Sequence, residues 1–377
     1  MQNLHPRYLH LSRITSVSNR IRKFSSDQSS RDKTINHMPS LTTTSPSPSP
    51  QKILLLQGDQ YQISPNGISR TLYKLSPLLI PVSIDAQNYR HPCHYSVEEE
   101  YDLNSAHKTF LIRKMSTNTL KPGRTLHTIR IQEIQNGIMG TAGTGSSTWE
   151  SSIAMSLYFS TRPALLKGQV LELGSGVGLA GLLTRNLLCR DDSHWHNVES
   201  FTLSDYSAEV IQQCRENLRN NSDDASFVDM DVCHINWYDF IQDGAVVEKK
   251  YDTIIASDIA YRRMDIVPMA ATLSSHLKKN DGSESDNKSI HMFGPNNRAV
   301  LHELIDELRK NWEVRTELIS MERCRLKPVD NNVQDSGVSA SSLNSYASKQ
   351  STDFLHVTIT QRSTSGQEEY PDISDID

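Results

Sequence analysis

Three closely spaced glycines give the chain a segment that can bind a nucleotide-like ligand. The stretch VLELGSGVGLAG, residues 170–181, starts with an apolar run that predicts a buried strand and continues into an apolar pattern that predicts a helix. Gly174, Gly176 and Gly178 allow left-handed backbone conformations between the two elements, and a helix N-terminus offers unpaired N–H groups to a ligand. A strand, a tight turn and a helix therefore predict a site for a nucleotide or nucleoside.

Two acidic residues lie on either side of this turn. Glu172 is inside the predicted strand, and Asp205 ends the next apolar stretch, SFTLSD. A carboxylate at the end of the second strand can accept hydrogen bonds from both ribose hydroxyls. Gly176, Gly178 and Gly181 also fit the G-x-G-x-x-G spacing of dinucleotide-binding folds, which leaves an NAD-dependent dehydrogenase open. The remaining alternative is a turn that only packs the strand against the helix.

Strands and helices alternate along the chain around these residues. Strands are predicted at residues 170–173, 201–203, 227–230, 252–257 and 289–294, and helices at residues 207–221, 267–279 and 298–311. This order favours an α/β fold with a doubly wound, mostly parallel, Rossmann-like sheet. Two final strands, 312–321 and 353–362, have no helix between them and should form an antiparallel hairpin.

The segment before the glycine turn predicts one strand and one helix. RTLHTIRIQEI, residues 124–134, predicts a strand with Ile129 and Ile131 on one face. STWESSIAMSLYFS, residues 147–160, predicts a helix capped by Ser147 or Thr148. We expect this helix to be partly buried through Ile153, Met155, Leu157 and Tyr158.

Composition divides the 377 residues into several parts. Residues 1–50 should be a disordered basic segment with a Ser/Pro linker, residues 51–139 a small N-terminal accessory region, and residues 140–362 the main domain. We expect a disordered insertion at residues 330–350 and an inert acidic tail at 363–377. The start of the chain is rich in Arg and Ser and has no acid before Asp27, as in a mitochondrial transit peptide or a basic tail.

Charge and cysteine content exclude several classes of protein. The net charge of −5 gives no global basic surface for nucleic acid, and no apolar stretch approaches the length needed to span a bilayer. The five cysteines include no C-x-x-C pair, so we expect reduced thiols and no metal site. We expect a monomer in the cytoplasm that binds neither nucleic acid nor membrane, or a mitochondrial protein if the N-terminus is a transit peptide.

Four motifs together resemble a known family over residues 140–362. VLELGSGVGLAG is similar to the first motif of the seven-strand S-adenosylmethionine-dependent methyltransferases. STWESS before the first strand, INW after the third and SDIAY ending the fourth are similar to the methyltransferase-16 family of protein-lysine methyltransferases. The stretch GTAGTGSSTWESSIAMSLY resembles the branch that methylates elongation factor 2. The resemblance implies a seven-stranded sheet, S-adenosylmethionine as cofactor and a lysine of a protein as acceptor, with a translation factor as the substrate.

The resemblance assigns part of the cofactor site to the glycine turn. Gly174, Ser175 and Gly176 would pass beside the methionine moiety, and Gly178 would complete the turn. Glu172 would order the loop.

The other cofactor residues come from four further positions. Asp205 would hold the ribose hydroxyls, and Trp237, from INW, would pack near the adenine edge. Trp149 matches a tryptophan that closes over the cofactor from its N-terminal side. Ser257 takes a place often occupied by alanine, lining the cleft at the end of the fourth strand.

Asp258 and Tyr261 form a D-x-x-Y sequence that resembles the family signature at the substrate channel. Ligands of open α/β sheets lie outside the carboxyl ends of the strands, where Asp258 falls. The two residues are therefore the catalytic candidates, Asp258 to orient the acceptor nitrogen and Tyr261 as a wall of the channel. The structural alternatives are that Asp258 caps the next helix and that Tyr261 is a core aromatic.

The acceptor itself is not legible in the sequence. A methyltransferase that acts on a small molecule or on a protein histidine stays an alternative to the lysine enzyme. A non-catalytic binding protein that keeps the fold is less consistent with the residues, because neither the glycines nor Asp258 is lost.

Overall fold

The computed structural model describes residues 68–76, 95–102, 107–116, 119–135, 142–188, 197–222, 228–241, 247, 249–280, 288–326 and 346–362. The chain divides into two units, residues 1–58 and 59–377, and every described residue belongs to the second. The expected basic N-terminus with its Ser/Pro linker and the acidic tail at 363–377 lie outside the described residues.

Five parallel strands form one end of the sheet. They are β5 (Gly168–Leu173), β6 (Val198–Asp205), β7 (Asp229–His234), β8 (Thr253–Ser257) and β9 (Ser289–Pro295), in the order β7-β6-β5-β8-β9. The chain runs outward from β5 in one direction through β6 and then in the other through β8, which leaves a crevice outside the carboxyl end of β5. The prediction of a doubly wound parallel sheet is confirmed.

A long antiparallel hairpin completes the seven strands that the sequence predicted. β10 (Glu313–Leu326) pairs with β11 (Tyr346–Thr360), and β11 lies antiparallel to β9. Because β11 begins at Tyr346, the last residues of the expected insertion at 330–350 belong to a strand, with Gln350 opposite Arg323. Residues 327–345 lie outside the described part of the chain.

Four N-terminal strands extend the same sheet beyond the predicted seven. β1 (Ile68–Leu75), β2 (Tyr95–Asp102), β3 (His107–Ser116) and β4 (Thr119–Gln132) pair in sequence order as an antiparallel meander. β1 pairs with the second half of β10, where Leu75 lies opposite Met321, so the sheet has 11 strands among the described residues. The described residues of the expected accessory region thus mainly form strands of one continuous sheet. Ile129 and Ile131 lie buried in β4, on one face, as predicted.

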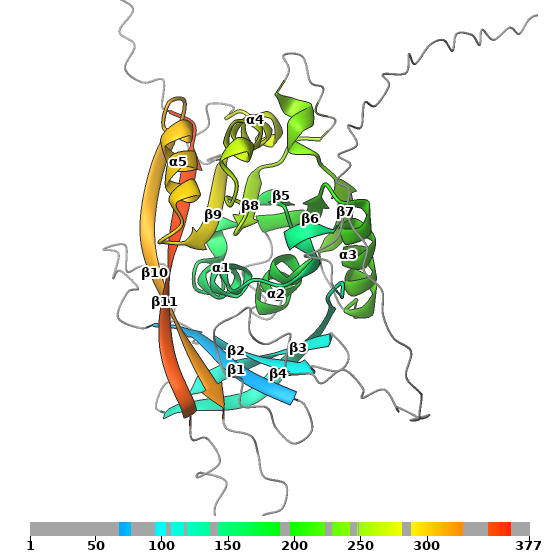
Figure 1. The fold of residues 1–377 in the computed structure, drawn as a ribbon, viewed down its shortest axis with the longest axis vertical. Helices are drawn as coiled ribbons and strands as arrows, with labels where there is room; N and C mark the ends of the chain where they lie inside the picture. Colours follow the sequence, from blue (N-terminus) through cyan, green and yellow to red (C-terminus); the bar gives the residue numbers. More distant parts are fainter. Residues whose placement is uncertain are drawn as a thin grey trace, which may run out of the picture. The chain divides into compact units, whose positions relative to one another are not determined.

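The helices lie in two layers, as Figure 1 shows. On one side are α1 (Glu150–Thr161), α2 (Leu179–Leu188) and α3 (Ala208–Asn220), between the parallel strands and β1–β4. On the other face are α4 (Ile266–His276) and α5 (Ala299–Leu308). Four short 3-10 helices, η5 (Gly143–Ser146), η6 (Pro163–Leu165), η8 (Trp237–Phe240) and η9 (Arg263–Asp265), connect them. This arrangement leaves the carboxyl rim of the parallel strands open to connecting loops.

Two expectations for α1 are wrong. The residue at its N-cap is Trp149, which makes no side-chain capping bond, and neither Ser147 nor Thr148 caps it. The helix is also buried on all sides from Ser151 to Phe159, because β1 and β2 cover the side that faces away from the parallel strands. Small residues permit this packing: the Ser156 hydroxyl donates to the Ser152 carbonyl at 2.8 Å and accepts from Thr184 Oγ1 at 3.0 Å.

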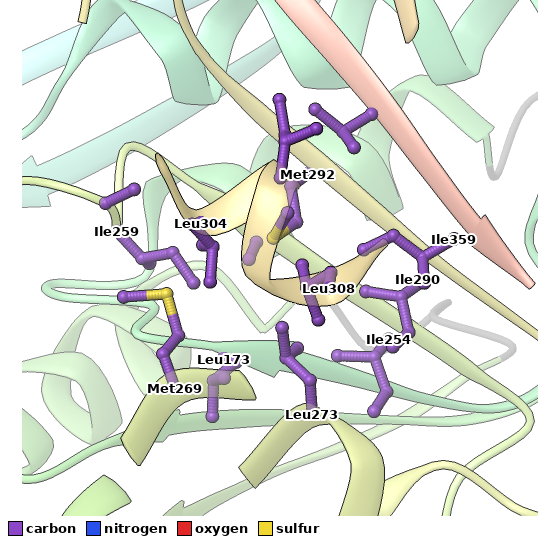
Figure 2. Packing of buried hydrophobic residues seen from close by; sticks show 14 of the residues in the cluster. Leu173, Ile254, Ile259, Met269, Leu273, Ile290, Met292, Leu304, Leu308 and Ile359 are labelled. Carbon is purple, nitrogen blue, oxygen red and sulfur yellow. The ribbon is translucent and has the colours of Figure 1, made fainter. Parts of the chain in front are cut away.

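Apolar side chains join α4 and α5 to the sheet, as Figure 2 shows. Leu173, Ile254 and Ile290 come from three neighbouring strands, and Met269 and Leu304 pack against them from the two helices. All five are at most 1% exposed. Burial of each large aliphatic side chain contributes about 1.5–3 kcal/mol, so this layer holds the strands whose carboxyl ends form the crevice.

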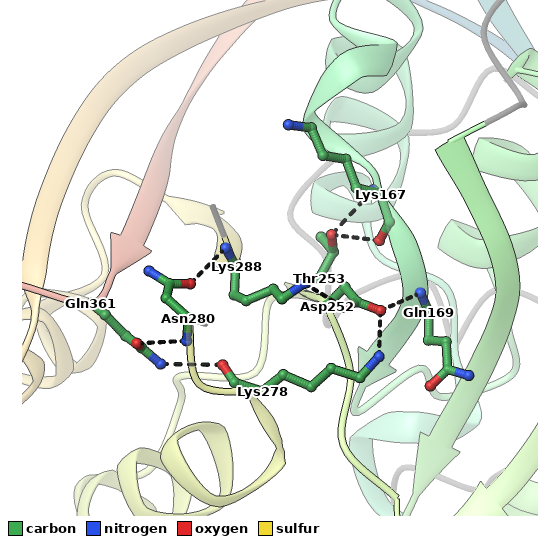
Figure 3. Close-up of polar contacts among 8 residues, drawn as sticks. All are labelled: Lys167, Gln169, Asp252, Thr253, Lys278, Asn280, Lys288 and Gln361. Atoms are coloured by element: carbon green, nitrogen blue, oxygen red, sulfur yellow. Dashed lines mark hydrogen bonds and ion pairs between the residues drawn. The ribbon is translucent and has the colours of Figure 1, made fainter. Parts of the chain in front are cut away.

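A polar cluster fixes the opposite, amino-terminal ends of these strands, as Figure 3 shows. Asp252, just before β8, accepts the N–H of Gln169 at 2.8 Å and pairs with Lys278 at 2.7 Å and Lys288 at 2.8 Å. The amide of Gln361 accepts from Asn280 N and donates to the Lys278 carbonyl. β5, β8, β9 and β11 are therefore tied together at the end away from the crevice.

Candidate active site

One pocket lies at the carboxyl rim of β5, β6 and β8 and is closed on one side by the segment that leads into α1. It encloses about 640 Å³, including the part open to solvent. Its walls come from five stretches of chain and consist of Thr144, Gly145, Ser147, Thr148, Trp149, Ser152, Gly174, Ser175, Gly176, Val177, Leu179, Asp205, Tyr206, Trp237, Ser257, Asp258, Ile259 and Tyr261. The structure therefore brings together nine of the eleven predicted site residues, all except Glu172 and Gly178.

The glycine turn forms the floor of this pocket. Gly174 and Gly176 have φ angles of 68° and 54°, in the left-handed region that disfavours other residues. A Cβ at Gly176 would lie 2.9 Å from the carbonyl oxygen of Gly145, and one at Gly174 would lie 2.8 Å from Ile259 Cγ2. The two glycines thus let the pocket walls approach the turn closely and keep the main chain accessible to a ligand.

Gly178 and Glu172 support the turn from inside the fold. A Cβ at Gly178 would meet Cys214 Sγ at 2.9 Å, so this glycine serves packing, and the structure gives it no contact with the pocket. Glu172 is 1% exposed, and burial raises its pKa to about 8, although the Gly181 N–H opposes that shift. The Glu172 carboxyl lies outside the pocket, and its expected role in ordering the loop stays a prediction.

Asp205 ends β6 with its carboxylate beside the glycine turn. It accepts the N–H of Gly176 at 3.2 Å and the N–H of Ser207 at 3.0 Å. Burial raises the pKa of Asp205, and these backbone N–H groups oppose the shift because they favour the ionised form. The residue is placed to present its carboxylate to hydroxyl groups of a ligand in the pocket.

Asp258 follows β8 directly and reaches the pocket from the other side of β5. Its φ angle of 56° is the only positive one among the described residues other than glycine. Its side chain is 7% exposed and pairs with Arg298 Nη2 at 2.9 Å, and burial raises its pKa while Arg298 lowers it. Asp258 caps no helix, because η9 begins after Arg262 and α4 after Asp265. A backbone held in this conformation at a pocket wall indicates a functional constraint.

Tyr261 and Ser257 complete this side of the pocket. Tyr261 is half-buried, and the guanidinium of Arg262 lies 5.7 Å from the centre of its ring. It therefore lines the pocket and is not a core aromatic. The Ser257 hydroxyl is 2.9 Å from that of Ser152 in α1, so the serine satisfies its hydrogen bonding inside the wall.

Besides Tyr261, three aromatic residues line the pocket, and sequence analysis identified two of them. Trp149 is 40% exposed and donates its ring N–H to the Thr144 carbonyl at 3.0 Å, while Trp237 lies beside Gly174. The third, Tyr206, is 51% exposed and directly follows Asp205. The signal in the sequence that could have identified Tyr206 was its position directly after Asp205, the predicted ribose-binding acid. The ring gives the pocket a further flat apolar surface on which a base can stack.

The sequence that forms most of this pocket matches a known protein family. Residues 127–285 match the sequence pattern of the lysine methyltransferase family. This segment is thus similar to the lysine methyltransferase family. The matched segment contains all the predicted site residues, from Trp149 to Tyr261. The expected family is thus confirmed, and it favours a methyltransferase over the NAD-dependent dehydrogenase that the glycine spacing left open.

Similar proteins include one curated enzyme and many solved structures. The mouse (Mus musculus) protein-lysine N-methyltransferase EEF2KMT is 27% identical over 133 residues, which are 33% of this chain and 37% of that enzyme. The similarity therefore spans little more than a third of that relative, and it agrees with the expected branch. A ribosomal protein L11 methylase from Lactobacillus delbrueckii has 13% identity and a TM-score of 0.33, covering 58% of this chain and 81% of its own. Magnesium protoporphyrin IX methyltransferase from Synechocystis has 12% identity and a TM-score of 0.32, covering 56% and 79%.

In the described part of the chain, no group of His, Cys, Asp or Glu side chains could hold a metal ion. No helix among the described residues has the length and apolar character needed to cross a membrane.

Proposed function

We propose that this protein transfers a methyl group from S-adenosylmethionine to a lysine side chain of a protein substrate. The observation that carries the proposal is the position of Asp258 and Tyr261 in the same pocket as the glycine turn and Asp205. One end of the pocket thus fits a nucleoside, and the other presents a carboxylate and an aromatic wall to an acceptor. The segment that matches the lysine methyltransferase family includes both ends.

The pocket residues fit this cofactor. The turn at Gly174 and Gly176 leaves space where a Cβ would collide with the opposite wall, so an amino acid moiety can lie against the main chain. Asp205 can accept from ribose hydroxyls, and Trp237 and Tyr206 offer aromatic surface to adenine. When bound, S-adenosylmethionine supplies an electrophilic methyl group on a positively charged sulfur.

The acceptor side of the pocket favours a neutral amine in a fixed orientation. A lysine amine with a reference pKa of about 10.4 must lose its proton before its lone pair can attack. Entry into a pocket walled by Tyr261 and Ile259 removes water from the amine, which disfavours the ammonium form. The Asp258 carboxylate can then accept one N–H and align the nitrogen, while the departing proton passes to water.

Exposed apolar side chains around the pocket favour a protein acceptor over a small molecule. Tyr238, Met264 and Val267 are 40%, 67% and 55% exposed, and they lie on η8, η9 and the first turn of α4. Tyr238 directly follows Trp237, and the other two lie three and six residues after Tyr261. Ile241, at the end of η8, is 47% exposed. A small acceptor inside the pocket would leave these side chains in water, whereas a protein surface around a target lysine would cover them. A translation elongation factor is the first candidate, because of the similarity to EEF2KMT.

Binding and transfer should be measured separately. Calorimetry with S-adenosylmethionine, S-adenosylhomocysteine and NAD on the folded chain should give heat for the first two only. Incubation with methyl-labelled cofactor and either purified elongation factor 2 or a cell lysate should label a discrete protein band, and mass spectrometry should place the label on lysine. Asp258→Asn is the control for transfer. Absence of cofactor binding would refute the methyltransferase proposal, and label confined to small molecules or to histidine would refute the lysine acceptor.

A further inference from the structure

The N-terminal strands β1–β3 lie outside the segment that matches the methyltransferase family, yet they contact the wall of the pocket. The match begins at residue 127, within β4. β3 carries Lys108, whose side chain is 16% exposed and points to the segment that leads into α1. That segment contains Thr144, Gly145, Ser147, Thr148 and Trp149, all of which line the pocket. The part of the sheet formed by β1–β4, called the N-terminal sheet below, therefore touches the side of the pocket opposite the glycine turn.

Lys108 is the centre of a polar cluster that ends on Thr148. Its Nζ donates to Thr148 Oγ1 at 2.8 Å and lies 3.1 Å from Glu133 Oε1 and 3.3 Å from Glu99 Oε1. Glu133 also accepts both the backbone N–H of Thr148, at 2.6 Å, and its hydroxyl, at 2.7 Å. The hydroxyl of Thr148 is thus bound by Lys108 of β3, and both its hydroxyl and its backbone N–H are bound by Glu133, the residue that follows β4.

A main-chain bond strengthens the same junction. The N–H of Ile134, next to Glu133, donates to the Ser146 carbonyl at 3.0 Å. Trp149 then follows Thr148, and its ring N–H returns to the Thr144 carbonyl. The fold of residues 144–149 consequently depends on groups delivered by the ends of β3 and β4.

A second attachment links β4 to the glycine turn. Asn217 of α3 is fully buried, and its amide accepts the Gln132 N–H at 3.0 Å and donates to the Gln132 carbonyl at 3.1 Å. The same amide group donates to the carbonyl of Val177, a pocket residue, at 3.0 Å. Asn221, one helical turn later, makes the equivalent pair of bonds with Arg130. The outer edge of β4 is therefore bound to α3, and α3 also supports the pocket wall that contains Val177.

Opposite charges on Lys108 and on Glu99 and Glu133 hold this junction together. Burial alone would lower the pKa of Lys108, but the Glu99 and Glu133 carboxylates raise it well above its ordinary value, so the ammonium stays charged. Removing one partner of a largely buried ion pair leaves the other charge uncompensated. Loss of Lys108 should therefore release Glu133 toward water, together with the two bonds that Glu133 makes to Thr148.

We infer that the N-terminal sheet is a positioning element for the cofactor pocket. Lys108 and Glu133 are the positioning residues, and they fix the position of the pocket wall formed by residues 144–149. Neither residue lines the pocket, so both act through Thr148 and the neighbouring Trp149. This inference rests on the proposed function for the identity of the ligand, but the geometry of the wall can be tested without any ligand.

The chain offers a closely matched control. Lys74 of β1 pairs with Glu322 of β10 at 2.8 Å, in the same N-terminal sheet, and the two side chains are 12% and 13% exposed. Those of Lys108 and Glu133 are 16% and 11% exposed. Lys108→Met and Lys74→Met thus each remove one ammonium from an ion pair of similar exposure. Glu322 keeps a second partner, Lys349, at 3.0 Å, and only Lys108 contacts the pocket wall. The double variant Lys108→Met with Glu133→Gln removes both charges and serves if the single variant does not fold.

Hydrogen–deuterium exchange of the full-length protein tests the wall directly. We expect the amides of residues 142–149 to exchange about tenfold faster in Lys108→Met than in the wild type, as a local opening free energy lower by about 1.4 kcal/mol implies, and to stay unchanged in Lys74→Met. Unchanged exchange in folded Lys108→Met, or an equal change in both variants, would overturn the inference.

Calorimetry then connects the wall to the ligand. Lys108→Met should bind S-adenosylmethionine about tenfold more weakly than the wild type, whereas Lys74→Met should stay within about twofold. Faster exchange with undiminished affinity would overturn a role in cofactor binding. If the wild type itself binds no S-adenosylmethionine, the proposed function fails, and the exchange experiment still decides whether the N-terminal sheet sets the wall.

Discussion

The guanidinium of Arg298 lies 2.9 Å from a carboxylate oxygen of Asp258. Arg298 is the N-cap residue of α5, and Asp258 directly follows β8, so the pair joins the start of α5 to the pocket wall. The Arg298 side chain is 30% exposed and the Asp258 side chain 7% exposed. A positive group next to this carboxylate favours its ionised form, which is the form that can accept an N–H from an acceptor amine.

Replacing Asp258 should separate turnover from cofactor binding. Asp258→Asn keeps the size of the side chain but removes its charge, so we expect kcat to fall by at least about tenfold while the affinity for S-adenosylmethionine stays within about twofold. Methyl transfer to the protein substrate and calorimetry measure the two quantities. Near-wild-type kcat in this variant would remove Asp258 from the mechanism.

Replacing Arg298 should shift the pH dependence of the same reaction. Burial raises the pKa of Asp258, and Arg298 and Ser151 oppose that shift. Without the guanidinium the pKa rises further, so the Asp258 carboxylate of Arg298→Met becomes protonated at a higher pH. We expect the acid limb of kcat/KM to move upward by about one pH unit, and Arg298→Lys to restore much of its position.

Arg263→Met is a suitable comparison for that shift. Arg263 pairs with Glu303 at 2.8 Å and thereby links η9 to α5, near Arg298 but away from Asp258. A purely structural effect of losing an arginine on this side should appear in both variants as a lower rate at every pH. Parallel profiles for the two variants would contradict the electrostatic role of Arg298.

Tyr261 should act through its ring more than through its hydroxyl. The residue lines the pocket beside Asp258, where an aromatic wall excludes water from an acceptor amine. We expect Tyr261→Phe to retain most of the wild-type kcat/KM and Tyr261→Ala to lose at least about tenfold. Steady-state kinetics on the protein substrate decide the point, and an equal loss in both variants would show that the hydroxyl is needed.

The parallel core was predictable because its strands are buried on both faces. Thr253–Ser257 is continuously apolar or small, and Val170–Leu173 is apolar except for Glu172; the structure contains the two runs in β8 and β5. β2 was missed, because it reads YSVEEEYD and three consecutive glutamates resemble a surface loop. Those carboxylates pair with Arg113, Lys108 and Arg70 on the neighbouring strands, a long-range compensation that local sequence patterns do not contain.

The site was predictable where its residues belong to contiguous motifs. Asp258 and Tyr261 follow a strand within four residues of each other, and the glycine turn is a single stretch. Arg298 was missed because it lies 40 residues after Asp258 along the chain and meets it only through the pairing of β8 with β9. Lys108 was missed for the same reason, since its contact with Thr148 requires the whole N-terminal meander to be in place.

Gly176 should tolerate no side chain. With φ at 54° and the Gly145 carbonyl 2.9 Å from a built Cβ, Gly176→Ala must move either the turn or the opposite wall. We expect the free energy of unfolding to fall by about 1–3 kcal/mol and the affinity for S-adenosylmethionine to fall by at least about tenfold. Urea unfolding and calorimetry measure the two effects.

Gly294→Ala provides the control for Gly176→Ala. A Cβ at Gly294 would meet only Leu301 Cδ2, the end of a side chain, and Gly294 lies outside the pocket. This variant should bind the cofactor like the wild type even if its stability falls. Normal cofactor affinity in Gly176→Ala would contradict the placement of the ligand against the turn.

Asp252 should stabilise the fold without affecting the site. Its carboxylate balances Lys278 and Lys288 at the end of the sheet opposite the pocket, with its side chain 11% exposed. We expect Asp252→Asn to lower the free energy of unfolding by about 1–2 kcal/mol at pH 7, between the values for exposed and buried pairs, and to leave kcat unchanged.

The pH dependence gives the sign of the Asp252 effect. Burial would raise the pKa of Asp252, but Lys278 and Lys288 lower it below its ordinary value. The stabilisation is therefore present above the unfolded pKa of about 3.9 and is lost as pH falls through the folded pKa. Asp306→Asn, at a side chain that is 74% exposed, should change stability little at any pH. An equal loss in both variants would contradict the assignment.

Two buried histidines should make the fold sensitive to mild acid. His291 Nδ1 lies 3.1 Å from His356 Nε2, and the pair continues to Ser289 at one end and to Glu317, with Tyr158, at the other. Burial lowers the pKa of both histidines; His356 lowers that of His291 further, and Glu317 opposes the shift of His356. Between the unfolded pKa of about 6.5 and the lower folded values, the unfolded chain binds more protons, so stability falls as pH falls.

His291→Gln should flatten that dependence. The variant has one fewer group to protonate on unfolding, which removes up to about 1.4 kcal/mol per pH unit from the slope below pH 6.5. Urea unfolding at pH 7.5, 6.5 and 5.5 measures the slope. His302→Gln is the control. His302 is exposed, and its Nε2 lies 2.7 Å from the Asn296 carbonyl oxygen. If His291→Gln and the wild type lose stability equally between pH 6.5 and 5.5, the buried pair does not control the acid sensitivity of the sheet.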